Sequence, residues 1–396
     1  MMTPRSPRIA FLYPTRSRLE RLDGVPRGET PKEFYYGYLG LKDRGFDAVM
    51  VDSQTDPKNP LGRLKLAADL RISGLTNLGL APQRIAAIAA DLSDADIALS
   101  FTDSFSLSLG LYGHRLPRPP LLVGGFHGLA DFPDRTPNRL RVYAVRKIRK
   151  ALAGLDHVFF FGEADRQESI RRYGLEPGKT SHFLFGVDTD FWTPGASSID
   201  EPPYVLSVGS DPKRDYKTLL DATIPAPVKI VTRLGIDDLA AYPNVEMIRG
   251  SFHNAAITDT ILRDLYRAAE VIVVPVKNVF QPSGYSVTLQ AMACGKPVVL
   301  SRIKGLWDPE ILESGKNCIL VEPENPQALG NAIMQLLHNP RLCTEMGTQA
   351  RETAVSHFGL DRMNRTLTSL IEHLSEISSV NSNEANSKES RNRINA

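Results

Sequence analysis

At 396 residues the chain is too long for one average hydrophobic core, so we expect two domains. Its 42% apolar and 23% charged residues are ordinary for a soluble globular protein. The formal net charge of +2 argues neither for nor against a polyanionic partner, and we expect no nucleic-acid partner. Three separated cysteines, Cys294, Cys318 and Cys343, fit a reducing compartment and exclude a disulfide framework or a zinc site. With no signal peptide and no ~20-residue apolar span, the prediction is a cytoplasmic protein.

Short apolar runs alternate with helical stretches in both halves of the chain. In the first half the runs cover residues 8–13, 46–51, 97–101, 120–125 and 158–161. In the second half they cover residues 204–208, 228–231, 245–248, 271–274, 298–300 and 318–321. Because strands separated by helices form parallel sheets, the alternation predicts an α/β protein with two Rossmann-like domains. We also expect a helix over residues 32–44 and an interdomain linker over 194–203.

A candidate phosphate loop follows the first strand of the second half. Gly209 allows a sharp turn after that strand, and Lys213, Arg214 and Lys217 supply cations where a diphosphate needs them. A helix over residues 218–222 comes next, and loops between strand and helix are common ligand sites in α/β folds. The alternative is a solvated loop whose charged side chains bind nothing.

A small Gly/Ser turn precedes the helix predicted at residues 287–294, which Gly295 ends. The candidate ligand-binding residues of this segment are Ser283, Gly284, Tyr285, Ser286 and Gln290. Small residues let a ligand approach the backbone, and a helix N-terminus can hold a diphosphate, while Gln290 could bond ribose hydroxyls. Taken alone, the segment could be an ordinary turn, since turns outnumber binding loops.

One histidine, His127, directly follows a predicted strand of the first half in the sequence G-G-F-H-G. At that position it would face the crevice where ligands bind, and it could orient a substrate hydroxyl or stabilise charge at a reacting carbon. A structural histidine is the alternative. Asp103, at the end of the neighbouring strand, is a weaker candidate on the acceptor side. The absence of a G-x-G-x-x-G fingerprint disfavours a dehydrogenase.

A run of basic residues spans the segment between Asp134 and Asp156 without an intervening acid. It holds Arg135, Arg139, Arg141, Arg146, Lys147, Arg149 and Lys150. Because Val142, Val145, Ile148 and Leu152 fall near one helical face, the pattern predicts an amphipathic cationic helix. Such a helix could lie on an anionic membrane at its inner face, or it could be an ordinary surface helix that packs its apolar face.

Several segments together resemble glycosyltransferase family 4, retaining enzymes of the GT-B architecture. Residues 289–299, L-Q-A-M-A-C-G-K-P-V-V, look like the family segment L-E-A-M-A-x-G-x-P-V-V. Residues 186–194, G-V-D-T-D-F-W-T-P, are similar to the family joint G-V-D-x-x-x-F-x-P. Residues 315–323 resemble the strand that follows, so the likeness runs from residue 8 to about 378.

The resemblance implies two Rossmann-like domains facing a central cleft. It places an acceptor-side domain at residues 1–188, a nucleotide-sugar domain at 189–360 and a returning helix at 361–378, while the polar composition of residues 379–396 predicts a disordered tail. It implies a retaining, metal-independent, hexosyltransferase-type enzyme without a cofactor or a protein nucleophile. The donor is a nucleotide diphosphate sugar, and the acceptor is a hydroxyl of a glycan, a lipid-linked or a small molecule. His127 and Arg214 would be catalytic, while Gly209 and Lys213 would bind the donor together with the ligand-binding residues of the Gly/Ser segment.

The chain departs from the family pattern at two positions. The family pairs two glutamates eight residues apart, where this chain has Pro282 and Gln290. Gln290 can still bond ribose, but Pro282 cannot replace the carboxylate that contacts the donor sugar, so Tyr285 or Ser286 could take that role. Three alternatives stay open: a non-catalytic nucleotide-sugar binder, a nucleotide-sugar epimerase and a phosphorylase. The nucleotide base, the sugar and the acceptor are not identified by the sequence.

Overall fold

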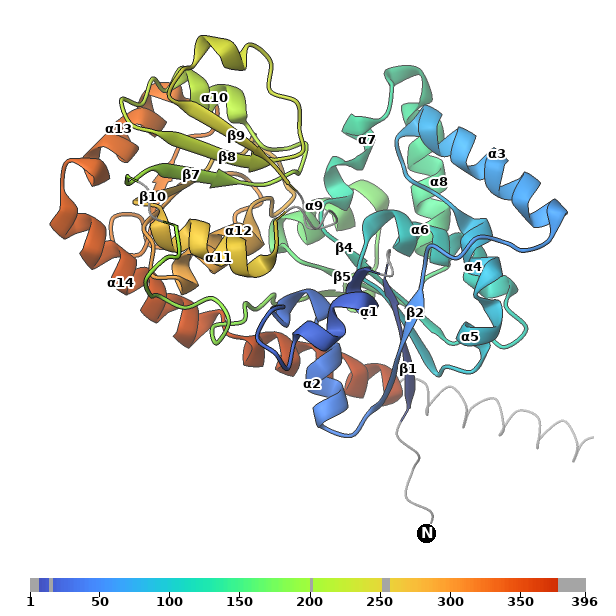
Figure 1. The fold of residues 1–396 in the computed structure, drawn as a ribbon. Coiled ribbons are helices and arrows are strands. Elements are labelled where there is room, and N and C mark those ends of the chain that lie inside the picture. The colour runs from blue at the N-terminus through green and yellow to red at the C-terminus, as the bar shows by residue number, and fades with distance from the viewer. Residues whose placement is uncertain (1–6, 14–16, 200–201, 251–256, 377–396) are drawn as a thin grey trace, which may run out of the picture.

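The computed structural model describes residues 7–13, 17–199, 202–250 and 257–376. It contains two six-stranded sheets, each with helices around it, and the two units stand side by side (Figure 1). We call the unit with strands β1–β6 the N-terminal domain and the unit with β7–β12 the C-terminal domain. The disordered tail expected at residues 379–396 lies outside the described residues.

The sheet of the N-terminal domain is parallel, with strand order β2-β1-β3-β4-β5-β6. Its strands are β1 (Arg8–Tyr13), β2 (Asp47–Asp52), β3 (Ile97–Ser100), β4 (Leu121–Phe126), β5 (His157–Phe160) and β6 (Thr180–His182). Its helices are α1 (Ser17–Arg21), α2 (Tyr38–Asp43), α3 (Pro60–Thr76), α4 (Pro82–Ala87), α5 (Ala89–Ser93), α6 (Asp103–Tyr112), α7 (Phe132–Arg135), α8 (Arg141–Ala153) and α9 (Glu163–Tyr173). Strands buried on both faces explain why these segments read as continuous apolar runs.

The sheet of the C-terminal domain is also parallel, with strand order β12-β11-β10-β7-β8-β9. Its strands are β7 (Val205–Val208), β8 (Val228–Thr232), β9 (Val245–Arg249), β10 (Val271–Val274), β11 (Val298–Ser301) and β12 (Ile319–Val321). Its helices are α10 (Tyr216–Asp221), α11 (Asp259–Ala268), α12 (Tyr285–Ala293), α13 (Pro326–Leu337) and α14 (Pro340–His357). The strand order reverses between β7 and β10, and ligands of open α/β sheets bind at such a switch point.

The chain crosses between the domains at two neighbouring places. Val187 forms an isolated parallel bridge with Gly359, and its N–H donates to Phe358 O over 2.7 Å. Residues 360–376 are helical and run along the N-terminal domain (Figure 1), where Arg44 Nη1 donates to Thr368 Oγ1 over 2.8 Å. The two crossings therefore share one backbone contact.

Two details of the N-terminal domain differ from the sequence prediction. The helix expected over residues 32–44 is broken into a 3-10 turn, Glu33–Tyr35, and α2, because Tyr36 and Gly37 take the left-handed conformation. The break lets the Tyr36 ring stack on Phe101 at 4.8 Å, beside the interdomain cleft. Strand β6 was not predicted, since its three residues T-S-H carry no apolar run.

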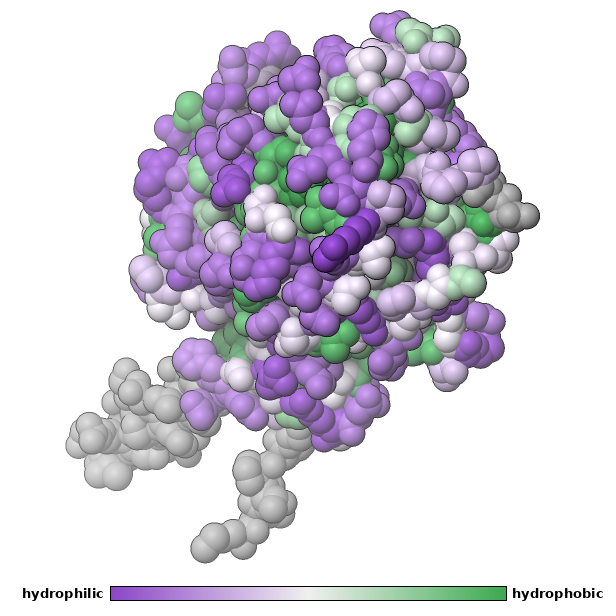
Figure 2. All heavy atoms as spheres, turned by 90° about the vertical axis from the view of Figure 1, so that its left-hand side faces the viewer, coloured by the Kyte–Doolittle hydropathy of each residue, from purple (hydrophilic) through white to green (hydrophobic). Residues whose placement is uncertain are grey.

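The outward side of the C-terminal domain is mostly hydrophilic, with apolar side chains showing in small patches (Figure 2). All three cysteines are buried and free, which leaves no disulfide among them. Apolar burial is concentrated between each sheet and its helices and at the domain contact, where one cluster includes Phe101 and Tyr36 from one domain and Tyr285 and Trp307 from the other. The two domains thus share part of their apolar packing.

Candidate functional site

A cavity of about 260 Å³ lies at the switch point of the C-terminal sheet and opens toward the N-terminal domain. The loop after β7 and the loop after β10 supply one side, since these two strands are neighbours in the sheet. Its lining includes Gly209, Ser210, Asp211, Arg214 and residues 281–287 from the C-terminal domain, and Phe34, Tyr36, His127, Phe161 and Phe185 from the rest. The structure therefore brings most of the predicted site residues into one cavity.

Arg214 is the cation of this cavity, and its side chain is 6% exposed. The guanidinium packs closely against two glycines that have positive φ. A Cβ atom added to Gly209 would stand 2.1 Å from Nε, and one added to Gly284 would stand 3.1 Å from Nη1. Neither Nε nor Nη1 has a hydrogen-bond partner among the described residues. Since burying an unpaired charged donor is costly, two free N–H groups at a cavity wall indicate a site for an anion.

The N-terminus of α12 borders the same cavity. The first i to i−4 bond of this helix runs from Thr288 N to Gly284 O over 3.0 Å, so the amides of Ser286 and Val287 have no partner within the helix. Both residues line the cavity beside Arg214. Amides at a helix N-terminus carry partial positive charge and favour a negatively charged ligand.

His127 lies on the N-terminal side of the cavity, immediately after β4. Its ring stacks on Phe161 at 3.9 Å, and Nε2 lies 3.0 Å from Phe101 O. Burial lowers the pKa of His127 from its ordinary value, while the nearby Asp103 carboxylate opposes that shift. Because a carbonyl only accepts, Nε2 carries the proton of the neutral ring, and Nδ1 is left as the acceptor.

Asp103, the weaker candidate on the acceptor side, holds the loop of His127. Its Oδ1 accepts the backbone N–H groups of His127 at 3.0 Å and Gly128 at 3.1 Å. Asp103 is the first residue of α6 and does not line the 260 Å³ cavity. Its position is that of a residue that orients His127.

A second cavity of about 360 Å³ adjoins the first, and the two share Phe34, Tyr36 and Gly209 in their walls. Gln290 lines this second cavity, but both ends of its amide are occupied. Nε2 donates to Glu33 Oε1 over 3.0 Å, and Oε1 accepts the Tyr266 hydroxyl at 3.2 Å. Because Glu33 and Tyr266 each engage one end of the amide, the ribose role predicted for Gln290 would have to use its second N–H or its second lone pair.

Glu33 is fully buried at this contact, and burial raises its pKa to about 7. Besides Gln290, it accepts Trp192 Nε1 at 2.7 Å and the Asp188 N–H at 3.3 Å. Glu33 belongs to the N-terminal domain, so this cluster joins the domains beside the second cavity.

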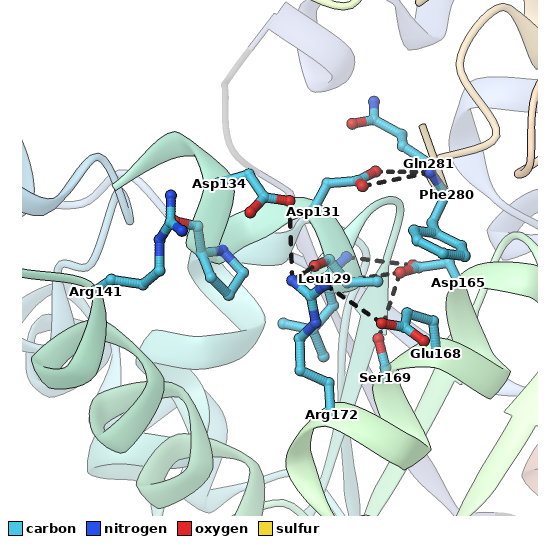
Figure 3. A network of polar contacts seen from close by, with 12 residues as sticks. Leu129, Asp131, Asp134, Arg141, Asp165, Glu168, Ser169, Arg172, Phe280 and Gln281 are labelled. Carbon is cyan, nitrogen blue, oxygen red and sulfur yellow. Dashed lines mark hydrogen bonds and ion pairs between the residues drawn. The ribbon is translucent and has the colours of Figure 1, made fainter. Parts of the chain in front are cut away.

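Asp131 joins the domains on the other side of the cleft (Figure 3). Its carboxylate accepts two backbone N–H groups of the loop after β10, from Phe280 at 3.3 Å and from Gln281 at 2.8 Å. Asp165 supports the segment beneath by accepting the N–H groups of Leu129 and Ala130 at 3.2 and 2.7 Å. The structure is therefore a closed arrangement in which both domains fix the loop that carries the predicted donor residues.

Other predicted residues are placed differently from expectation. Lys213 does not line either cavity, because the turn that it forms with Asp211 directs Arg214 inward instead. The Tyr285 hydroxyl is 3.2 Å from Asp308 Oδ2 and its ring stacks on Trp307, so its polar end is engaged within the C-terminal domain. Lys217 pairs with Asp221 on the surface of α10. Of the three cations predicted for the phosphate loop, only Arg214 lines either of these two cavities.

The basic segment divides into two parts. Arg135 contacts the cleft, where its Nη2 donates to Gln281 Oε1 over 2.8 Å, so it does not belong to an outward cationic surface. The buried face of α8 consists of Ala144, Ile148, Ala151 and Leu152, and this helix packs on α6. Val142 was expected on that face but is 66% exposed. The burial of the α8 apolar face agrees with an ordinary packing helix.

Asp211, Gln281, Glu33, Tyr36 and Asp131 were not predicted as site residues. The sequence carried a signal for Asp211, because an acidic residue between Gly209 and Arg214 is unexpected in a loop that binds a diphosphate. Glu33 contacts Gln290 although they are 257 positions apart in the sequence, and no local pattern predicts such a contact.

Residues 205–339 match the family model described as "Glycosyl transferases group 1". The match covers most of the C-terminal domain. A D-inositol 3-phosphate glycosyltransferase of Catenulispora acidiphila is 28% identical to this chain over 236 residues, covering 50% of this chain and 51% of that protein. The spore coat protein SA of Bacillus subtilis is 34% identical over 84 residues, 21% of this chain and 22% of that protein. The chain thus spans about half the length, or less, of these relatives.

Solved structures extend the likeness from this domain to the whole fold. A sucrose-phosphate synthase of Thermosynechococcus elongatus has a TM-score of 0.68 at 21% identity, over 94% of this chain and all of that one. HepE of Anabaena, solved with UDP and glucose, has a TM-score of 0.63 at 18% identity, over 92% and 99% of the two chains. The fold predicted from the sequence, GT-B, is confirmed.

Neither a membrane-spanning helix nor a cluster of metal ligands occurs in the described part of the chain. Within it, helices are too short or too polar to span a bilayer. No group of three or more His, Cys, Asp or Glu side chains placed to hold a metal ion occurs in those residues.

Proposed function

We propose that this protein transfers a sugar from a nucleotide diphosphate sugar to an acceptor hydroxyl, with retention at the anomeric carbon. The observation that carries the proposal is Arg214, which lines a cavity beside a helix N-terminus and has two buried guanidinium nitrogens without a hydrogen-bond partner among the described residues. A diphosphate supplies anionic oxygens for these donors. The match to the group 1 glycosyl transferase model and the name of the first relative support the same reaction class.

In the proposed reaction the bond between the anomeric carbon and the β-phosphate oxygen breaks, and the acceptor oxygen forms the new bond on the same face. The acceptor proton passes to the departing phosphate oxygen. Arg214 and the amides of Ser286 and Val287 stabilise the negative charge that grows on this leaving group, an electrostatic contribution that is usually the largest one in catalysis. His127, with Nδ1 as acceptor, holds a hydroxyl on the N-terminal side of the cavity.

The nucleoside fits the second cavity, which continues from the first past Gly209. Phe34 and Tyr36 provide rings in its wall from the N-terminal domain, so closure of the two domains would complete the nucleoside site. Closure would also exclude water and limit hydrolysis of the donor. We expect catalysis without a cofactor and without a metal ion, so transfer should persist in EDTA.

The deciding experiment is a thermal-shift screen of UDP, GDP, ADP and dTDP and their sugars, followed by a transfer assay with the sugars that bind. Arg214→Ala should abolish the shift, while Arg341→Ala on the exposed face of α14 serves as the matched control. We expect a loss of about 10²- to 10³-fold in transfer rate for Arg214→Ala. No shift with any nucleotide would contradict the proposal.

The products distinguish retention from inversion, and they distinguish a glycosyltransferase from the alternative functions. Proton NMR of the first product formed gives the anomeric configuration, and an inverted product would contradict retention. A protein that binds a nucleotide sugar tightly but forms no product with any acceptor would be a non-catalytic binder. Product that forms without an acceptor favours an epimerase, and dependence on inorganic phosphate favours a phosphorylase.

A further inference from the structure

We propose that Asp211 is the carboxylate that recognises the hydroxyls of the transferred sugar, and so determines which sugar is accepted; this inference rests on the proposed function. Among the described residues that line the 260 Å³ cavity, Asp211 is the one with a carboxylate. It belongs to the loop after β7 that also carries Arg214, although the two side chains form no ion pair within 4.0 Å in the described structure.

The charge of Asp211 restricts what it can contact. A carboxylate beside a diphosphate would repel it, so the anion belongs on Arg214 and the amides of α12, and Asp211 must face an uncharged part of the ligand. Oδ2 accepts from Gln281, whose side chain contacts Arg135 and Gly128 of the N-terminal domain, so the carboxylate lies toward the N-terminal side of the cavity. That side is where the sugar and the acceptor meet in the proposed reaction. A neutral sugar hydroxyl that donates to the carboxylate there makes a charge-assisted hydrogen bond.

The carboxylate is held in one orientation and still has acceptor capacity. Oδ2 accepts Gln281 Nε2 and Ser283 Oγ, both at 2.7 Å, and Oδ1 accepts the Lys213 N–H at 3.0 Å. These are three hydrogen bonds, whereas an ionised carboxylate offers about four lone-pair sites. A side chain fixed by three protein donors is preorganised, and its remaining acceptor site can take a sugar hydroxyl without reorganisation.

Both domains fix Asp211 through Gln281. Arg135 Nη2 donates to Gln281 Oε1 over 2.8 Å, and Asp131 accepts the Gln281 N–H at 2.8 Å, so the N-terminal domain holds the residue that holds Asp211. Figure 3 shows Asp131 directed at this loop. The sugar-recognising carboxylate would therefore be in place when the cleft is closed around the ligand. In the open protein Gln281 would lose both supports.

The loop after β10 offers a second place for the same carboxylate. Pro282 lines the same cavity and is adjacent to Ser283, whose hydroxyl touches Asp211. A glutamate at position 282 would bring its carboxylate into the region that Asp211 now serves. This makes a relocation experiment possible, in which the carboxylate is removed from one loop and restored on the other.

The first test measures affinity by calorimetry for the preferred nucleoside diphosphate and for its sugar conjugate. Asp211→Ala should lower the affinity for the sugar conjugate by roughly 10- to 100-fold, the range expected for a hydrogen bond to a charged group. The nucleoside diphosphate itself should bind equally well or more tightly, since a nearby negative charge is removed. Equal loss for both ligands would overturn the proposal, because it would mean that Asp211 only shapes the loop.

The second test asks which hydroxyl is recognised. Donors that lack one sugar hydroxyl at a time are compared in wild type and in Asp211→Ala, as a double-mutant cycle. For one hydroxyl, its removal should lower kcat/KM in wild type but not in Asp211→Ala. Independent effects at every position of the ring would overturn the assignment.

The third test is rescue by Pro282→Glu in the Asp211→Ala background. Recovery of at least tenfold in the affinity for the sugar conjugate would support the proposal, and a fall with both ligands would count against it. Thermal unfolding of each variant controls for folding. If wild type binds no nucleoside diphosphate, the proposed function fails before Asp211 is tested. If it binds the diphosphate but Asp211 changes nothing, only the present inference fails.

Discussion

Arg214 and Gln290 are both polar, both almost fully buried and both at the wall of the interdomain cleft, yet their surroundings differ. Arg214 leaves two N–H groups without a partner among the described residues, whereas Gln290 has Glu33 on one end of its amide and Tyr266 on the other. A buried donor without a partner is costly in the absence of a ligand, so it marks a place where a ligand supplies the partner. A buried amide with both ends paired contributes to the contact between domains.

The largest expected effect follows from removing the charge of Arg214 but keeping its volume. Arg214→Met should lower the transfer rate by about 10²- to 10³-fold. It should not lower the unfolding midpoint of the ligand-free protein, because the guanidinium has few hydrogen bonds to lose and a costly burial to relieve. Differential scanning calorimetry with and without nucleoside diphosphate measures both parts. A large loss of ligand-free stability would show that Arg214 is structural, like Gln290.

The second effect concerns the pH dependence of the Glu33 cluster. Burial raises the pKa of Glu33 to about 7 in the folded protein, above its ordinary value of 4.5. The folded state therefore binds the proton more tightly than the unfolded state, and this contribution to stability is lost as the pH rises from about 4.5 to 7. The loss is on the order of 3 kcal/mol.

Glu33→Gln removes the titrating group from this cluster while keeping its shape. Urea unfolding of wild type and variant between pH 4.5 and 8 measures the difference in their free energies of unfolding. That difference should change steadily toward favouring Glu33→Gln up to about pH 7 and be constant above it. A difference that does not vary with pH would exclude Glu33 as the titrating group.

The third effect tests whether Gln290 is structural. Gln290→Glu places a carboxylate 3.0 Å from Glu33, where two like charges cannot both ionise cheaply. We expect a loss of about 2 kcal/mol in the free energy of unfolding at pH 8, and less at pH 5. The exchanged pair, Glu33→Gln with Gln290→Glu, should recover most of it by restoring one carboxyl and one amide. Equal stability of the single and the exchanged variants would contradict the paired role.

The contrast also explains how far the sequence could predict this site. Strands such as β10 and β1 were predicted with their bounds because each is a buried apolar run, and Arg214 and Gly284 were found because they flank such strands. The pairing state of Arg214 and Gln290 depends on residues of other segments, including Glu33 at 257 positions away. Asp211 was visible as a residue, but its role requires Gln281, Arg135 and the second domain, which only the folded chain brings together.

The smallest expected effect applies the same contrast to apolar surface. The apolar face of α8 is covered by α6, whereas α3 leaves Leu61, Leu64, Leu70, Ile72 and Leu75 exposed at 60%, 69%, 46%, 42% and 54%. Exposed leucines interspersed with Arg63, Lys65 and Arg71 suit an anionic lipid surface, so we propose α3 as a membrane contact in place of the one predicted for the basic segment that includes α8.

Co-sedimentation with anionic and neutral vesicles at two salt concentrations tests this contact. Leu64→Ser with Leu75→Ser should lower binding to anionic vesicles by several-fold, since partly inserted leucines gain only a fraction of the about 1.5–3 kcal/mol that full burial of each would give. Val355→Ser on α14, 50% exposed, is the matched control and should change nothing. If the α3 variant and the control bind alike, the exposed leucines of α3 do not contact lipid. Helix α8 is then an ordinary surface helix that packs on α6. If only the α3 variant loses binding, the uncovered apolar face of α3 binds the lipid surface.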